Sequence, residues 1–272
     1  MELIKLTLTG LMLGGSIVIP GISAGTMAVV FNIYDRLIGI ITPNIKKILA
    51  SWKFWLPIAI GVIAGVNIVS KIISILYENY QMPTVWFFIG VIIGSIPLIY
   101  KRTCQASASC PSLSAIISAV AAFAVMVAMI FLSPNENTSI YTELTPHLIT
   151  LLFLGGFFAA IAMVIPGISG AFLLLIIGMY QTIVTAVSDL NVPFLAVFSS
   201  GVIAGLLIGA AFIRYLLEKA PRETYGAVLG LVAGSVIVLF PGGFGDGITI
   251  IISIATLLAG SALSFFMGNQ KN

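Results

Sequence analysis

The sequence predicts an all-α polytopic membrane protein with an inverted structural repeat, in which each half has a broken (re-entrant) helical hairpin followed by transmembrane helices. Three observations lead to this fold class. Of the 272 residues, 60% are hydrophobic and only 8% are charged, whereas soluble domains carry about 25% charged residues. The apolar residues gather in runs long enough to cross a bilayer. One six-residue Pro-Gly motif occurs twice, each time inside a long apolar stretch.

Six of the apolar runs have the length of an ordinary transmembrane helix, which needs roughly 20 residues. They lie at about 54–77, 84–100, 112–132, 193–217, 224–240 and 248–268. We expect each of these runs to cross the membrane once, because polar or charged loops separate them.

Two further stretches, residues 3–41 and 147–187, are each near 40 residues long and therefore too long for one crossing. The hexapeptide Val-Ile-Pro-Gly-Ile-Ser interrupts both of them. Since Pro and Gly together stop a helix, each stretch is predicted to be a helix, a break and a second helix. Both a re-entrant hairpin and two full crossings satisfy this pattern.

The repeated motif indicates that the chain arose by duplication. Val18–Ser23 and Val164–Ser169 are identical and 146 residues apart, and Tyr34 and Tyr180 keep the same separation. Two further matches occur 140 residues apart: the sequence Gly-Val-Ile-Ala-Gly at 61–65 and 201–205, and the set Gly90, Gly94 and Ser95 with Gly230, Gly234 and Ser235. We assign the first repeat to residues 1–132 and the second to residues 147–268. The glycine patterns are predicted to pack helices closely.

Loop charges predict the orientation. Lys and Arg occur in the loops at 36–53, after residue 100, at 218–223 and at the C-terminus, whereas the intervening loops at 78–83, 133–146, 188–192 and 241–247 have none. The positive-inside rule then places both termini in the cytoplasm. Because three crossings separate the two hairpins, the repeats are inverted. Inverted repeats with paired broken helices are typical of transporters whose site lies near the membrane midplane.

The two breaks are the predicted binding site. Unpaired backbone groups in lipid cost several kcal/mol each, so such breaks persist only inside protein or beside a wet cavity. Helix starts with open N–H groups favour an anion. The candidate residues are Pro20, Gly21, Ser23, Gly25 and Thr26 in the first break, and Pro166, Gly167, Ser169 and Gly170 in the second. The alternative is a proline kink that the serine merely caps.

Two cations within apolar runs, Lys71 and Arg214, are further candidates for anion binding, one in each half. The alternative is that both extend toward the membrane surface. Asp35 and Arg36 end the first hairpin and either pair at the interface or join the site. We treat them, with Glu78, as candidates for coupling or gating.

The motifs resemble those of the PopT-type polyprenyl-phosphate transporter family, once catalogued as a domain of unknown function. The similarity rests on Gly-Ile-Ser-Ala-Gly-Thr, Ile-Tyr-Asp-Arg-Leu-Ile and Ile-Ala-Met-Val-Ile-Pro-Gly-Ile-Ser-Gly, followed by Gly-Met-Tyr, and runs from about Leu8 to Phe240. The resemblance implies translocation of undecaprenyl phosphate across the bacterial cytoplasmic membrane during recycling of this lipid carrier. One departure is that Gly15–Val18 lacks the acidic residue expected before the first break, which leaves proton coupling open.

Two other functions are compatible with parts of the sequence. A transporter of a soluble anion would use the same site, but its site would open only to water. A membrane-embedded lipid phosphatase would need an acid–base or nucleophile set, whereas His147 stands alone and no carboxylate pair is visible. We therefore expect no enzyme activity, no cofactor or metal ion, and no nucleic-acid partner. Cys104 and Cys110 are predicted to be free thiols.

Overall fold

The computed structural model describes residues 2–17, 23–105, 112–131, 141 and 143–268, and within these ranges the chain is helical with no strand. The first part of the chain forms α1 (Glu2–Ile17), α2 (Ala24–Val30), α3 (Tyr34–Ile40), α4 (Ile45–Ala50), α5 (Trp52–Asn79), α6 (Gln81–Gln105) and α7 (Leu113–Ile130). The second part forms α8 (Pro146–Val164), α9 (Gly170–Ile176), α10 (Tyr180–Ser188), α11 (Val192–Lys219), α12 (Pro221–Leu239) and α13 (Ile248–Gly268). The predicted all-α fold is confirmed.

Several helices are long and apolar enough to cross a membrane. Within the described residues these are α6, α8, α11, α12 and α13, and the bent pair α9–α10 would make a sixth span. Shorter apolar helices occupy parts of α1, α5 and α7. The six predicted single spans overlap α5, α6, α7, α11, α12 and α13, and their bounds in the membrane stay a prediction. The chain is therefore a multi-pass membrane protein.

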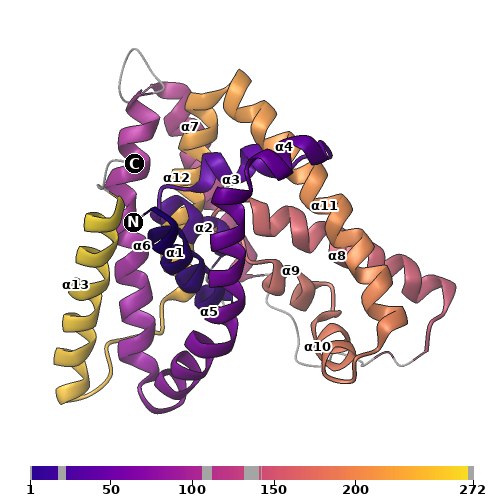
Figure 1. Cartoon of the computed structure of the whole chain (residues 1–272). Helices are drawn as coiled ribbons and strands as arrows, with labels where there is room; N and C mark the ends of the chain where they lie inside the picture. Colours follow the sequence, from indigo (N-terminus) through magenta and orange to yellow (C-terminus); the bar gives the residue numbers. More distant parts are fainter. Residues whose placement is uncertain (1, 18–22, 106–111, 132–140, 142, 269–272) are drawn as a thin grey trace.

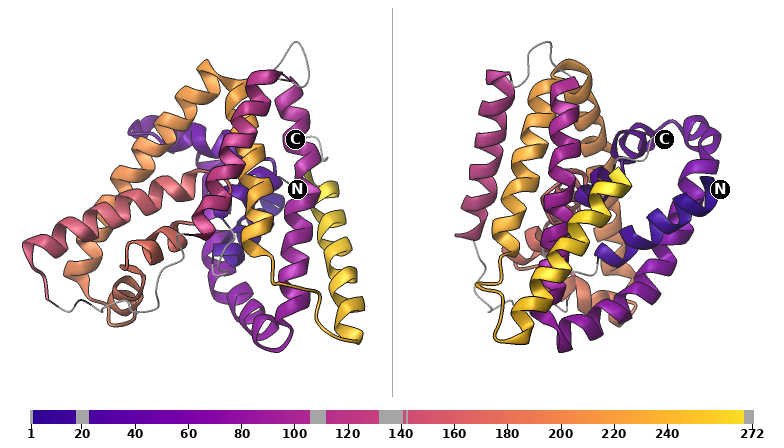
Figure 2. Two further views of the ribbon diagram at one scale, coloured as in Figure 1. Left: turned by 180° about the vertical axis from the view of Figure 1, so that it is seen from behind. Right: turned by 90° about the vertical axis from the view of Figure 1, so that its left-hand side faces the viewer.

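Four helices lie side by side in the order α7, α12, α6 and α13 (Figure 2, right), and we call them the four-helix layer. Two further helix pairs, α1 with α5 and α8 with α11, make up most of the rest of the fold (Figure 1). The layer interleaves the two parts of the chain, because α6 pairs with α13 from the second part and α12 pairs with α7 from the first. The two sequence segments are therefore not separate lobes.

Glycines bring the backbones of these paired helices into direct contact. A Cβ atom on Gly61 would lie 2.1 Å from the carbonyl oxygen of Thr7 on α1, and one on Gly201 would lie 2.1 Å from that of Phe153 on α8. In the four-helix layer, a Cβ on Gly90 would lie 2.1 Å from the carbonyl oxygen of Leu257. Even alanine would clash at these positions, so the predicted packing role of the repeated glycines is confirmed.

Each long stretch predicted as a hairpin is divided into three helices. The first stretch contains α1, α2 and α3, and the second contains α8, α9 and α10. The short helices α2 and α9 have seven residues each and start 146 residues apart. A second turn ends each of them, at Asn32 with φ 59° and at Gly178 with φ 75°. The bend between α9 and α10 is 117°, so this segment is not a straight span.

One expectation from the sequence is wrong. Cys104, in the last turn of α6, is disulfide-bonded rather than a free thiol. Only five residues separate Cys104 from Cys110 in the sequence, and so short a loop costs little entropy to close.

Candidate functional site

The helix α2 packs directly against the second Pro-Gly break, so residues from the two motifs meet in the interior. The hydroxyl oxygen of Thr26 accepts a hydrogen bond from the Gly167 N–H at 2.7 Å, and both groups are buried. A Cβ on Gly25 would lie 3.0 Å from the oxygen of Met163 and 3.2 Å from the nitrogen of Pro166. The structure therefore brings together four predicted site residues, Gly25, Thr26, Pro166 and Gly167.

Tyr34, at the start of α3, supplies a second link to the same break. Its hydroxyl donates to the carbonyl oxygen of Val164 at 3.0 Å, in a buried position. Val164 is the last residue of α8, so its carbonyl belongs to the group that a helix end leaves without an intrahelical partner. Side chains of the first hairpin thus satisfy backbone groups that the second break exposes.

Gly167 has a conformation and a position that only glycine fits. Its φ of 93° lies in the left-handed region, and a Cβ there would come within 2.8 Å of Leu231 on α12. Glycine adopts this backbone conformation without steric penalty. The break is therefore held between Thr26 on one side and α12 on the other.

The two motif serines differ in their partners. The Ser169 hydroxyl accepts a hydrogen bond from the Phe172 N–H at 3.4 Å, which is N-cap geometry for α9. Ser23 occupies the corresponding position before α2 but makes no such bond. Its side chain is 3% exposed, and within the described part of the chain its hydroxyl has no hydrogen-bond partner. The capping alternative thus fits Ser169, whereas Ser23 retains an unused donor.

The remaining members of the predicted site lie elsewhere or outside the described residues. Gly170 packs against α8, where a Cβ would meet the Ala159 oxygen at 2.6 Å. Pro20 and Gly21 fall outside the described residues, as do the side chains of Lys71 and Glu78.

Arg214 contacts the end of α3 rather than either break. Its guanidinium donates to the carbonyl oxygens of Ile38 and Ile41, each at 3.4 Å. These carbonyls belong to the last turn of α3 and its C-cap, where a cation also interacts favourably with the helix dipole. The exposed Arg36 lies with its guanidinium 4.0 Å from the centre of the Phe54 ring.

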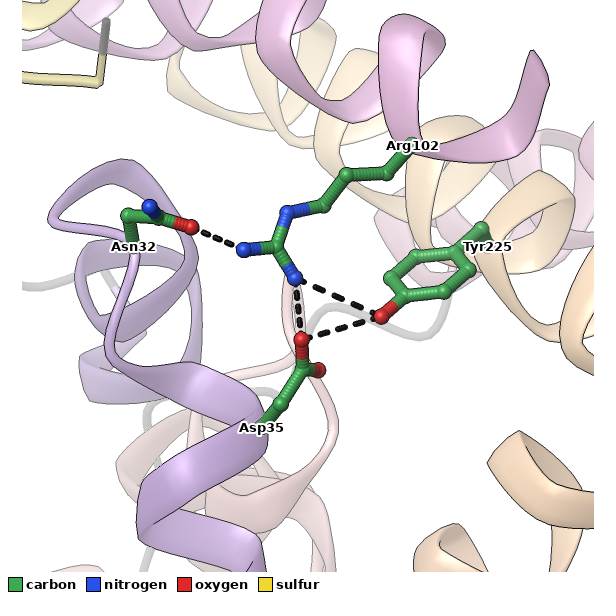
Figure 3. Close-up of polar contacts among 4 residues, drawn as sticks. All are labelled: Asn32, Asp35, Arg102 and Tyr225. Carbon is green, nitrogen blue, oxygen red and sulfur yellow. Dashed lines mark hydrogen bonds and ion pairs between the residues drawn. The ribbon is translucent and has the colours of Figure 1, made fainter. Parts of the chain in front are cut away.

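A polar cluster that the sequence analysis did not identify joins three helices (Figure 3). The Arg102 guanidinium, from the end of α6, donates to the carboxylate of Asp35 and to the side-chain oxygen of Asn32. Tyr225, from α12, donates to Asp35 at 3.0 Å and accepts from Arg102 at 3.4 Å. We call these four residues the Arg102 cluster. It fixes the turn between α2 and α3 to α6 and α12.

In the Arg102 cluster Asp35 pairs with Arg102 of α6, and not with Arg36 as one alternative from the sequence had it. A role of Asp35 in coupling or gating stays a prediction. Asp35 Oδ1 is buried without a hydrogen bond, so the carboxylate is only half satisfied. In the second repeat the positions equivalent to Asn32 and Asp35, 146 residues later, are Gly178 and Gln181. Neither carries a charge, so Asp35 has no charged counterpart in that repeat. The missed signal was Arg102, which the sequence analysis used only as a marker of membrane orientation.

An apolar cavity of about 200 Å³ borders the meeting point of the breaks. Ala24, Gly25 and Val164 line one part of it, and Ile38 and Ile41 line another. We call it the hairpin cavity. Among the described residues no group of three or more His, Cys, Asp or Glu side chains could hold a metal ion. The apolar lining of the hairpin cavity suits an apolar group, held next to Gly25 of the first motif and Val164 of the second.

Comparisons with known proteins agree on one family. The family model described as undecaprenyl phosphate translocase-like (VCA0040-like) matches residues 12–252. A polyprenyl-phosphate transporter of Staphylococcus aureus is 29% identical over 269 residues, covering 96% of this chain and 94% of that protein. A polyprenyl-phosphate transporter of Vibrio cholerae is 30% identical over 255 residues, covering 89% and 79% respectively. No solved structure matches. With its model matched over most of the length, the chain belongs to the undecaprenyl phosphate translocase-like family.

Proposed function

We propose that this protein moves a polyprenyl phosphate, such as undecaprenyl phosphate, across the bacterial cytoplasmic membrane without altering it chemically. The observation that carries the proposal is the buried contact between the two broken helices, made by Thr26 and Gly167. Broken helices inside a membrane protein are where transporters place their substrate. The names of the two relatives supply the substrate class.

The phosphate head group is proposed to bind between the breaks. Ser23 offers a buried hydroxyl without a partner. The Gly167 N–H is held by a side-chain hydroxyl, so a phosphate oxygen can replace Thr26 as its acceptor. Hydrogen bonds to a charged oxygen are about twice as strong as neutral ones, which favours the exchange. The rest of the proposed set is Pro20, Gly21, Gly25, Lys71, Pro166, Ser169, Gly170 and Arg214.

The inverted repeat, with both termini cytoplasmic, is part of the proposal. Supporting it, the turn after α2 and the turn after α9 have the same hydrogen bond, from Ile33 N–H to Ala28 oxygen and from Met179 N–H to Leu174 oxygen, each at 2.9 Å. Helices α5 and α11 also have 28 residues each. Two equivalent hairpins of opposite direction would expose one site alternately to each side.

The Arg102 cluster is proposed to be the gate on the cytoplasmic side. The positive-inside argument places Asp35 and Arg102 at that end, and the cluster locks the first hairpin to α6 and α12. Head-group passage to this side requires the lock to open. Arg36 and Glu78 stay as candidates for coupling.

Direct binding tests the proposed function. Purified protein is titrated with undecaprenyl phosphate, with undecaprenyl pyrophosphate and inorganic phosphate as competitors. We expect Ser23→Ala to weaken binding roughly tenfold, the loss of one charge-assisted hydrogen bond. Ser264→Ala is the matched control, because the Ser264 hydroxyl on α13 is also buried without a partner. Competition by inorganic phosphate with no need for the lipid tail would instead identify a transporter of a soluble anion.

A further inference from the structure

A second apolar cavity lies on another side of α2. It has a volume of about 430 Å³, within the range of ligand pockets. Met12 and Met27 line its inner part, and Leu76, Tyr80, Phe87 and Ile252 line the rest. We call it the α13 cavity. Met27 lies within α2 between Gly25 and Ala28, which line the hairpin cavity, so α2 separates the two cavities.

The two cavities lie toward opposite ends of the membrane-spanning helices. On α5, Ile58 lines the hairpin cavity, whereas Leu76 lines the α13 cavity. At a rise of 1.5 Å per residue, Leu76 is about 27 Å from Ile58 and about 21 Å from Val62, which also lines the hairpin cavity. On α1 the neighbouring residues Met12 and Leu13 line one cavity each, so the two cavities extend from opposite ends of α5 and approach each other at α1 and α2. One cavity is therefore positioned for each leaflet, and α2 with its break lies between them.

Both cavities have apolar rims at the molecular surface. Ile252 is 39% exposed on the α13 cavity and Met163 is 42% exposed on the hairpin cavity. Exposed apolar side chains on membrane helices face hydrocarbon, so each rim meets lipid. Both threonine hydroxyls that line the α13 cavity are already used, because Thr84 donates to the carbonyl oxygen of Tyr80 at 2.7 Å and Thr256 donates to that of Pro83 at 2.8 Å. The cavity thus presents an apolar surface to its occupant.

We infer that these cavities hold the first isoprene units of a polyprenyl chain, the α13 cavity while the head group is on one side of the membrane and the hairpin cavity after it has crossed. The inference rests on the proposed function. A tail in either cavity lies beside α2, because Gly25, two residues after Ser23, lines the hairpin cavity and Met27, four residues after Ser23, lines the α13 cavity. The tail therefore changes cavities as the head group passes the break, and remains in hydrocarbon throughout.

Filling each cavity with a larger side chain tests this inference. Ile252→Trp reduces the α13 cavity, and Ile254→Trp is its control on the same helix, since Ile254 is 44% exposed but does not line the cavity. Met163→Trp reduces the hairpin cavity, with Leu154→Trp as the control on α8 at 40% exposure. Binding to protein in nanodiscs is measured with undecaprenyl phosphate and with the short-chain geranyl phosphate.

We expect at least one filled variant to bind undecaprenyl phosphate about tenfold more weakly than its control, the usual effect of overpacking a site. Geranyl phosphate, whose tail is too short to fill the cavity, should lose less affinity. If both filled variants bind undecaprenyl phosphate like the unsubstituted protein, the tail inference is wrong and the proposed function survives. Equal competition by phosphatidylglycerol would make the occupant an ordinary acyl chain. If the unsubstituted protein binds neither polyprenyl phosphate, the proposed function itself fails.

Discussion

Two side chains, Thr26 and Ser23, distinguish the first hairpin break from a simple proline kink. Thr26 satisfies a backbone N–H of the other motif, while Ser23 leaves its own hydroxyl without a partner in the interior. A buried hydroxyl without a hydrogen bond costs about 1–3 kcal/mol. At the start of α2 this hydroxyl is a donor available to the proposed phosphate head group.

Replacing Thr26 by valine should lower the free energy of unfolding by about 1–3 kcal/mol, because the Gly167 N–H would stay buried without an acceptor. Thermal unfolding in detergent measures the effect. Thr26→Ser keeps the hydroxyl and should restore most of the stability. Equal stability of Thr26→Val and Thr26→Ser would show that the bond contributes nothing.

The Arg102 cluster predicts a change in accessibility rather than in stability. Its ion pair is partly exposed, so breaking it should alter the free energy of unfolding only modestly. Ile99 borders the cluster and is fully buried. The experiment introduces a thiol by Ile99→Cys in a protein lacking the native cysteines and measures its reaction with a soluble maleimide. Adding Asp35→Asn should make this reaction roughly tenfold faster, because losing the charge of Asp35 raises the population of the open state by about that factor.

Asp189→Asn serves as the control for that labelling experiment, since Asp189 is at the C-cap of α10 and outside the cluster. An unchanged labelling rate in the Asp35→Asn protein would mean that the cluster does not limit access to the interior.

At the scale of the helix, sequence patterns located the spans well and the hairpins incompletely. A long run of apolar residues predicts a span because the bilayer core excludes charged side chains and unpaired backbone groups. The second turn of each hairpin was missed because its signal is weak: Gly178 is an ordinary turn residue, but Asn32 adopts a positive φ without being glycine. The partners in the Arg102 cluster could not be assigned from the sequence, since its hydrogen bonds join residues 67 to 190 positions apart that carry no common motif.

Glycine contacts between paired helices make a sharp prediction about stability. Gly61→Ala should destabilise the protein by about 1–3 kcal/mol, since the added methyl group would lie 2.1 Å from the Thr7 oxygen and the helices must separate. Gly39→Ala, also in a helix, has nothing within 4 Å of the new atom and should be neutral or slightly stabilising. The unfolding midpoint should therefore fall for Gly61→Ala and stay or rise slightly for Gly39→Ala. An equal fall in both variants would refute the packing argument.

At the scale of the whole molecule, membrane orientation is still a prediction. Leu190 and Lys47 are exposed. They belong to the segments 188–192 and 36–53, which are predicted to lie on opposite sides of the membrane. In a cysteine-free background, Leu190→Cys should react with an impermeant maleimide in intact cells, and Lys47→Cys should react only after permeabilisation. The reverse pattern would invert the topology and move the Arg102 cluster to the outer side.

The four-helix layer pairs early helices with late ones, which affects the order in which the protein folds during synthesis. Helices α6 and α7 leave the ribosome well before α12 and α13, yet their glycine-lined partners are those late helices. Until α12, which begins at Pro221, and α13, which begins at Ile248, are synthesised, the close-packing faces of α6 and α7 have only lipid or an insertion factor as a neighbour. A chain interrupted after α7 consequently contains one helix of each pair in this layer. The layer is complete only when α13 packs against α6 in the membrane.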